Sequence, residues 1–245
     1  MHSLRIRLIK ALVDINEKLF FERRLLRFYK KAIGTGAHTV IDVGANKGQS
    51  IDFFLKLNNA CRIYAIEPNP ELFEGLKLRY ANKQHVHLFR LGISNINGER
   101  EFQENVLDYT SSFEELNSSS AYLSRKAKIL GVDKSQLIVK RYPVDVMTLC
   151  DFIRQNNLPN IIDILKIDTE GHEYACLEGL FHTDLKSKIR YIQLENHTDD
   201  MYSNRIPYEK MKELLKVNGF FEEKVILHGY SRLEEVIFKN AHVTM

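Results

Sequence analysis

The sequence predicts an α/β protein with a Rossmann-like, mostly parallel sheet covered by helices on both faces. From residue 38 onward, short apolar runs alternate with segments whose apolar residues recur at helical spacing. This alternation requires parallel strands joined by right-handed crossovers. The last two apolar runs are separated by HGYSR, which is short enough for an antiparallel hairpin at the sheet edge. We therefore expect seven core strands with a C-terminal hairpin, unlike the usual dinucleotide-dehydrogenase sheet.

These patterns place the elements along the chain. The runs that read as strands are 39–45, 61–68, 86–94, 160–168, 190–197, 220–227 and 233–240. The segments at helical spacing are 48–58, 70–82, 146–157, 172–181 and 207–219. Two further runs, 98–106 and 136–144, look like additional strands on either side of a polar segment at 108–133. Part of this segment, 119–131, has the pattern of a short helix.

Composition limits the class of protein. A chain of 245 residues has room for one full α/β domain but not for two. The net charge of +3 is too small to indicate nucleic-acid binding, which needs concentrated positive charge. Three scattered cysteines without metal-ligand spacing fit reduced thiols. No apolar run approaches the about 20 residues of a membrane span, and Lys10 and Asp14 interrupt any signal-peptide core. We expect a cytoplasmic protein.

Residues 1–33 form a predicted amphipathic helical segment that precedes the α/β domain at 34–245. Proline and glycine are absent from 3–33, and Gly34 and Gly36 end the helix. The polar face carries the cations Arg5, Arg7, Lys10, Arg23, Arg24, Arg27, Lys30 and Lys31. The main interpretation is packing on the domain or on a second subunit. The alternative is weak contact with an anionic membrane surface.

The first strand leads into a turn with the glycine spacing GxxxG at Gly44 and Gly48. Gly44 allows a tight backbone turn, and Gly48 is expected to let a ligand approach the start of the next helix. The unpaired N–H groups there suit a carboxylate or phosphate. Because the GxGxxG fingerprint is absent, a ligand with a carboxylate and an ammonium is favoured over a pyrophosphate. Asp42, at the strand end, is placed to meet the ammonium.

The second strand ends in Glu67, followed by Pro68. A carboxylate at this tip can accept hydrogen bonds from both hydroxyls of a ribose. The alternative is that Glu67 caps the helix starting near Pro70; the glycine turn upstream favours the ribose role. Ser94 follows the third strand, and two interpretations stay equally open. It lies in the loop that covers an adenine edge, or it is only a turn residue.

Four motifs in this order resemble the FkbM-type methyltransferase family: IDVGANKGQS, YAIEPNPELFEGLK, LGISNINGEREF and ILKIDTEGHEYACLEGL. The resemblance covers about 39–197. It implies a class I methyltransferase fold, S-adenosylmethionine as methyl donor, and usually O-methylation of sugars or hydroxylated natural products. It also implies a donor site lined by Asp42, Gly44, Asn46, Gly48 and Glu67. Ser50, Pro68, Ser94 and Asp168 complete our donor-site candidates. The segment at 108–133, expected to be an acceptor-side loop or lid, and the N-terminal helix lie outside the motifs and are expected to set the acceptor.

Methyl transfer to a hydroxyl needs the acceptor oxygen aligned with the methyl carbon and the sulfur, and a base near the hydroxyl proton. Ligands of open α/β sheets bind beyond the carboxyl ends of the strands. Two such ends supply the catalytic candidates, which are Asp168, Glu170, His172, Glu195 and His197. Asp168 ranks first for contact with the donor or the acceptor, and His172, Glu195 and His197 compete as the base. The alternatives are that Asp168 or Thr169 caps the following helix, and that His172 is a solvated first-turn residue.

Lys166 lies in a strand that we expect to be covered on both faces, where an unpaired ammonium is costly. It shares a strand face with Asp168, so we predict an ion pair with Asp42, Asp168 or Glu195. The carboxylates and imidazole at these strand ends are also Mg²⁺ ligands. Without a dedicated ligand spacing, a divalent metal is not favoured.

The sequence thus predicts an O-methyltransferase for a sugar, a glycan or another polyhydroxylated small molecule. Two alternatives stay open: N- or O-methylation of a different metabolite, and a non-catalytic subunit that binds S-adenosylmethionine. RNA methylation is disfavoured because the chain has no basic–aromatic patch and no appended RNA-binding module. A homo-oligomer is compatible with the sequence.

Overall fold

The structure, a computed structural model, describes residues 21–105, 111–130, 133, 137–196, 200–204, 206–228 and 234–243. The predicted helix over the first 20 residues and the candidate His197 lie outside this part of the chain.

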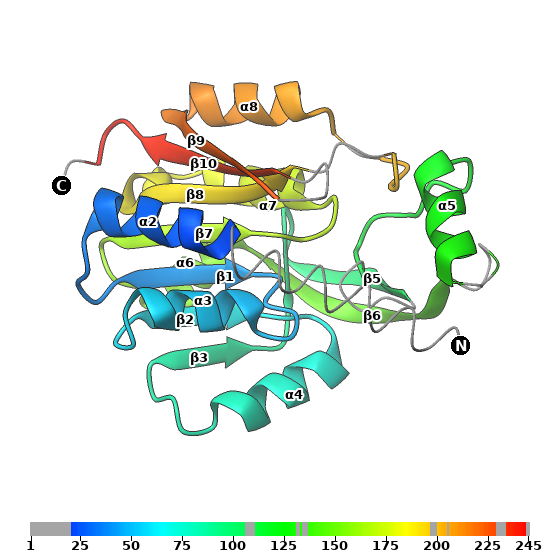
Figure 1. The fold of residues 1–245 in the computed structure, drawn as a ribbon, viewed down its shortest axis with the longest axis horizontal. Coiled ribbons are helices and arrows are strands. Elements are labelled where there is room, and N and C mark those ends of the chain that lie inside the picture. The colour runs from blue at the N-terminus through cyan, green and yellow to red at the C-terminus, as the bar shows by residue number, and fades with distance from the viewer. Residues whose placement is uncertain are drawn as a thin grey trace.

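A seven-stranded sheet forms the centre of the molecule, with the order β3-β2-β1-β7-β8-β10-β9 (Figure 1). Its strands are β1 (Thr39–Val43), β2 (Arg62–Ile66), β3 (Val86–Phe89), β7 (Ile162–Ile167), β8 (Ile189–Asn196), β9 (Phe220–Leu227) and β10 (Glu234–Asn240). Strand β10 is antiparallel to β8 and β9, and the other neighbours are parallel. The predicted mostly parallel sheet with a C-terminal antiparallel hairpin is confirmed.

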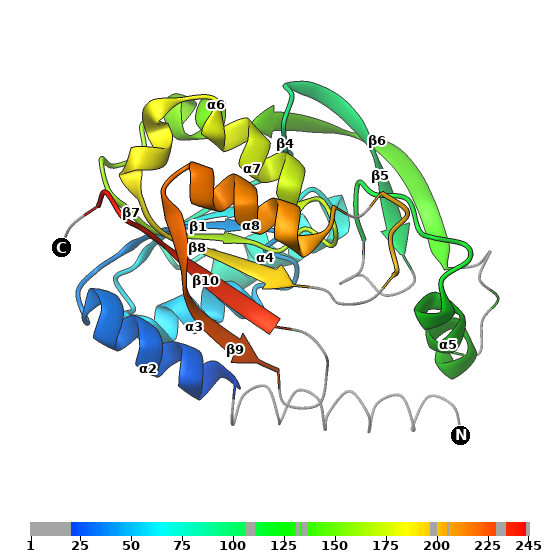
Figure 2. The same cartoon turned by 90° about the horizontal axis from the view of Figure 1, so that it is seen from above.

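Helices cover both faces of this sheet (Figure 2). Those on one face are α2 (Glu22–Ile33), α3 (Gln49–Leu57) and α4 (Pro70–Tyr80); those on the other are α6 (Leu149–Gln155), α7 (Glu173–Phe181) and α8 (Tyr208–Val217). A short 3₁₀ helix, η4 (Asp184–Lys188), precedes β8. Every residue of β1 and β7 is buried. This explains why most of their residues are apolar, because parallel strands between two helical layers have no solvent face.

Helix α2 ends at Ile33, before Gly34, as predicted. Its buried residues Leu25 and Tyr29 join the core formed with α3 and the sheet. The opposite face exposes Arg23, Arg24, Arg27, Lys30 and Lys31. Residues 22–33 of the predicted helical segment thus pack on the sheet core, and contact of the basic face with a membrane stays a prediction. Among the described residues, no helix has the length and apolar character to cross a membrane.

Two predicted boundaries are wrong because a second, three-stranded sheet with the order β4-β6-β5 branches from the core. The predicted single strand at 86–94 divides into β3 and β4 (Gly92–Ser94), since β4 leaves the main sheet to pair with β6 (Ile138–Thr148). The predicted helix at 146–157 starts later, because β6 continues to Thr148, whose hydroxyl caps α6.

The predicted additional strands are confirmed as β5 (Gly98–Asn105) and β6, which pair antiparallel. The predicted short helix is confirmed as α5 (Ala121–Leu130). Both views show α5 beyond the ends of β5 and β6, away from the main sheet (Figures 1 and 2). Leu123 and Ala127 of α5 pack on Met201 and Tyr202. Nearer its start, the polar segment reaches the carboxyl end of β7, where Ser112 Oγ donates to the Thr169 carbonyl.

Candidate active site

The glycine turn after β1 brings the ends of β1 and β7 together. Gly44 has φ +83°, and a Cβ there would lie 1.8 Å from the carbonyl oxygen of Asp168. The Asp168 N–H donates to the Val43 carbonyl across 3.0 Å. Gly44 and Ala45 both donate to the Ile66 carbonyl at 3.0 Å. The predicted tight turn is confirmed, and only glycine fits it.

The surroundings of Gly48 also require glycine, while its role in letting a ligand approach stays a prediction. It has φ +87°, and a Cβ there would lie 2.4 Å from the hydroxyl oxygen of Tyr80. That hydroxyl lies 2.8 Å from the Gly48 carbonyl and 2.8 Å from Asp52 Oδ1. The space on the Cβ side of Gly48 is therefore filled by Tyr80 of α4. Helix α3 starts at the next residue, so its first N–H groups still face the turn.

Asp42 lies beneath this turn and is fully buried. Ser50 Oγ donates to Asp42 Oδ2 across 2.5 Å, and Lys166 Nζ lies 3.8 Å from Asp42 Oδ1. Burial raises the pKa of Asp42, while Lys166 and the Ser50 hydrogen bond oppose the rise. Asp42 and Ser50 thus support the turn from inside, and their contact with a donor stays a prediction.

Glu67 joins the tip of β2 to the glycine turn. Its carboxylate accepts hydrogen bonds from the Asn46 N–H at 2.7 Å and the Asn69 N–H at 2.8 Å. Burial raises the pKa of Glu67 to about 7, and the two N–H donors limit the rise. Asn69 caps α4 by accepting from Glu71 and Leu72, next to Pro68 and with Pro70 in the first turn. The helix-capping alternative for Glu67 is therefore wrong.

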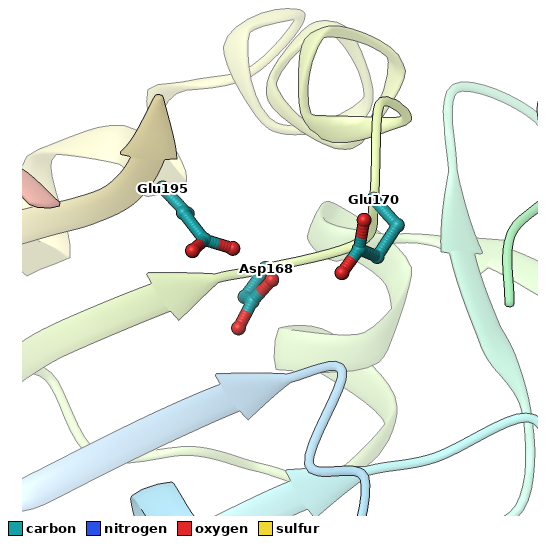
Figure 3. A group of neighbouring side chains, drawn as sticks. All are labelled: Asp168, Glu170 and Glu195. Carbon is teal, nitrogen blue, oxygen red and sulfur yellow. The ribbon is translucent and has the colours of Figure 1, made fainter. Parts of the chain in front are cut away.

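Three carboxylates converge beyond β7 and β8 (Figure 3). Asp168, Glu170 and Glu195 each place a carboxylate oxygen within 4.8 Å of the others. Lys166 Nζ donates to Asp168 Oδ2 across 2.9 Å, which confirms the predicted ion pair. Glu170 has φ +55°, and the Tyr202 hydroxyl donates to its Oε2 at 3.0 Å. The structure thus brings three of the predicted catalytic residues to one place beside the glycine turn.

The turn between β7 and α7 is closed by a residue that the sequence did not single out. The Glu173 carboxylate accepts from the N–H groups of Thr169, at 2.9 Å, and of Gly171, at 3.1 Å. The residue before α7 is His172, and its side chain forms no cap. The alternative in which Asp168 or Thr169 caps this helix is wrong.

His172 is 1% exposed, so the solvated first-turn alternative is wrong as well. Its Nδ1 lies 2.7 Å from Glu114 Oε1, and its Nε2 lies 3.2 Å from an Arg100 nitrogen and 3.0 Å from Ser94 Oγ. Arginine only donates, so Nε2 accepts and the ring proton sits on Nδ1, which donates to Glu114. Both ring nitrogens are engaged inside the protein. His172 thereby joins β4, β5 and α7 to Glu114 of the polar segment, and its role as a base stays a prediction.

Ser94 is likewise buried, at the end of β4 rather than in a loop. Arg100 and His172 both contact its hydroxyl. Sequence reasoning missed Glu114, Arg100 and Tyr202, whose polar types give no local signal of these long-range contacts.

The sheet has the strand order of class I methyltransferases, with β10, the last strand along the chain, antiparallel to both of its neighbours. The structure is similar to the methyltransferase domain of METTL16, covering 89% of this chain and 65% of that chain with 10% identity and a TM-score of 0.50. It is also similar to a SAM-dependent methyltransferase from Aquifex aeolicus, over 94% and 95% of the two chains, with 15% identity and a TM-score of 0.46. Likeness at such identity concerns the fold alone.

A family model described as the methyltransferase FkbM domain matches residues 42–222. The chain therefore belongs to the FkbM methyltransferase family, and the resemblance seen in its motifs is confirmed. It is also similar to the 2-O-methyltransferase NoeI of Sinorhizobium fredii, with 24% identity over 178 residues, which are 72% of this chain and 70% of that protein.

Proposed function

We propose that this protein transfers a methyl group from S-adenosylmethionine to a hydroxyl of a sugar or another polyhydroxylated small molecule. The observation that carries the proposal is the group of Asp168, Glu170 and Glu195 beside the glycine turn. Membership of the FkbM family supports methyl transfer as the reaction, and the similarity to the 2-O-methyltransferase NoeI supports oxygen as the acceptor atom. All three cysteines are buried and unpaired, which supports a reducing compartment such as the cytoplasm.

The residues around the glycine turn fit this donor. S-adenosylmethionine supplies an electrophilic methyl group on a sulfonium. In the proposal, N–H groups at the start of α3 bind its carboxylate, and Glu67 accepts from its ribose hydroxyls. The carboxylates of Asp168 and Glu67 also supply negative charge near the sulfonium and the ammonium of S-adenosylmethionine. Hydroxyl donors stabilise the ionised form of a carboxylate whose pKa is raised by burial, so Glu67 is suited to this role.

The acceptor lies, in this proposal, on the side of Glu195. A small cleft there is lined by Gly171, Glu173, Tyr174, Glu195, Asn196, Tyr202, Ile206 and Met211. Aromatic and apolar side chains suit the C–H faces of a sugar ring, and carboxylate and amide oxygens suit its hydroxyl edge. Lys166 already neutralises part of the charge on Asp168. We therefore assign the base role to Glu195 and the orientation of the acceptor to Asp168.

Two measurements on the full chain test the proposal. Calorimetry with S-adenosylmethionine is expected to show one binding site. Transfer of a labelled methyl group to a panel of sugars, polyols and amines is then expected to label hydroxyl compounds. Labelling of amines alone would favour the N-methylation alternative. Donor binding without transfer to any acceptor would favour a non-catalytic subunit.

A further inference from the structure

A row of buried polar side chains crosses the sheet face that α2 and α3 cover. Asp42, Lys166 and Gln193 are in register on the adjacent strands β1, β7 and β8. All three are buried, and the surrounding core is apolar, with Ile164 and Ile237 on the same face. Replacing buried ion pairs by apolar side chains is often neutral or stabilising. The polar row therefore points to a role other than stability.

One end of the row reaches helix α2 and strand β10. The Tyr29 hydroxyl donates to Gln193 Oε1 across 2.6 Å, inside the protein. Gln193 Nε2 in turn donates to Glu235 Oε2 across 2.9 Å. Tyr29 is fully buried and Glu235 is 5% exposed, so water does not compete for these bonds. Helix α2 and the C-terminal hairpin are thereby tied to the middle of the sheet.

The other end of the row reaches the candidate active site. Lys166 Nζ lies 2.9 Å from Asp168 Oδ2 and 3.8 Å from Asp42 Oδ1. Burial alone would lower the pKa of Lys166, but the carboxylates of Asp168, Asp42 and Glu235 outweigh burial and raise it. Lys166 thus stays charged, and the charge of Glu235 acts on the same ammonium that holds Asp168.

We propose that Tyr29, Gln193, Glu235 and Lys166 form a positioning relay that sets the orientation and the net charge of Asp168. This inference rests on the proposed function, in which Asp168 takes part in methyl transfer. In the relay, the Glu235 carboxylate competes with Asp168 for the Lys166 ammonium, so Lys166 neutralises less of the charge on Asp168. Tyr29 holds Glu235 in place through its hydrogen bond to Gln193. Tyr29 precedes the family-matched region 42–222 and Glu235 follows it. Membership of the family therefore assigns no role to either residue.

The first test measures amide hydrogen exchange of residues 168–171 in the ligand-free protein. Tyr29→Phe removes one hydroxyl, and Glu235→Gln removes one charge with little change of shape. Both are expected to slow exchange in this turn by about threefold to tenfold, because Lys166 is then held by Asp168 with less competition from Glu235. The matched control is Tyr208→Phe, which removes a tyrosine hydroxyl 3.3 Å from Glu222, outside the relay. This control variant is expected to leave the exchange rates of residues 168–171 unchanged. If exchange in the turn is unchanged in both relay variants, the relay is overturned.

The second test is a double-mutant cycle read as donor affinity by calorimetry. Glu235→Gln is expected to weaken donor binding by about threefold to tenfold in the parent, and to have no further effect beside Asp168→Asn. Effects that multiply would overturn coupling through Asp168. If the parent protein does not bind S-adenosylmethionine, the proposed function fails. The exchange measurement then decides on the relay by itself.

Discussion

The Asn46 N–H donates to the Glu67 carboxylate across 2.7 Å, so the glycine turn and the tip of β2 form one unit. Asn46 has φ +50°, a left-handed conformation that asparagine tolerates better than most residues. The hydrogen bond holds the Glu67 side chain at the edge of the turn, where the donor ribose is proposed to bind. The protonation state of the Glu67 carboxylate is therefore expected to affect both the geometry of the turn and the affinity for the donor.

Donor binding is expected to tighten as the pH rises from 6 to 8. The pKa of Glu67 is raised to about 7 by burial. A protonated carboxyl has less capacity to accept from two hydroxyls, so protons compete with the donor. The dissociation constant should fall by about tenfold over this range, following the ionised fraction. Calorimetry at a series of pH values measures it.

The control for this pH dependence is Glu67→Ala, for which affinity should be at least about tenfold weaker and nearly independent of pH. An affinity of the parent that does not change with pH would contradict the assignment. Stability gives a second check. Between pH 4.5 and about 7 the native protein retains a proton that the unfolded chain releases. The free energy of unfolding, relative to Glu67→Ala, should therefore fall as the pH rises through this window.

Gly44→Ala is expected to destabilise the fold by roughly 2–5 kcal/mol. The new methyl group would meet the backbone oxygen of Asp168, which cannot move away without breaking the β1–β7 contact. The control is Gly75→Ala in α4, where a Cβ meets nothing within 4 Å. There, alanine should stabilise the helix by about 0.5–1 kcal/mol. Denaturant unfolding measures both, and equal effects would contradict the packing argument.

The order of strands and helices could be predicted wherever burial is complete. Strands such as β1 and β7 have no solvent face, so their mostly apolar sequences can be recognised as buried strands. Strand β6 is only partly buried, and its last residues, up to Thr148, carry apolar side chains that also fit the start of a helix. The break between β3 and β4 depends on which sheet each strand joins. Strand β4 joins the second sheet because it pairs with β6, which is distant in the sequence.

The sequence could name donor-site candidates because each of them lies in a local motif at a strand end, and their contact with a donor stays a prediction. The Lys166–Asp168 pair was predictable for the same reason, since strand alternation places both on one face. The partner of His172 was not predictable. Glu114 lies 58 residues away in a polar segment, and its contact depends on how that segment folds back. No spacing in the sequence encodes it.

Glu195→Gln and His172→Asn are expected to separate the base from the positioning residue. Loss of a general base lowers kcat by about 10²–10⁴-fold, which we expect for Glu195→Gln. His172→Asn should lower kcat by less than about tenfold, well below the loss of a base. It should also destabilise the fold by about 1–3 kcal/mol, because Glu114 loses a buried partner. Steady-state kinetics and unfolding curves measure these effects, and the reverse ranking would contradict the assignment.

Activity is expected to survive treatment with EDTA. The three carboxylates beyond β7 and β8 are oxygen ligands of the kind that Mg²⁺ prefers. However, the Lys166 ammonium already contacts Asp168, and the Tyr202 hydroxyl already donates to Glu170. A divalent cation would have to displace both contacts and face the charge of Lys166 at short range. Dialysis against EDTA, followed by assays with and without added Mg²⁺, measures the dependence. Loss of turnover that Mg²⁺ restores would show that the metal outcompetes these side chains.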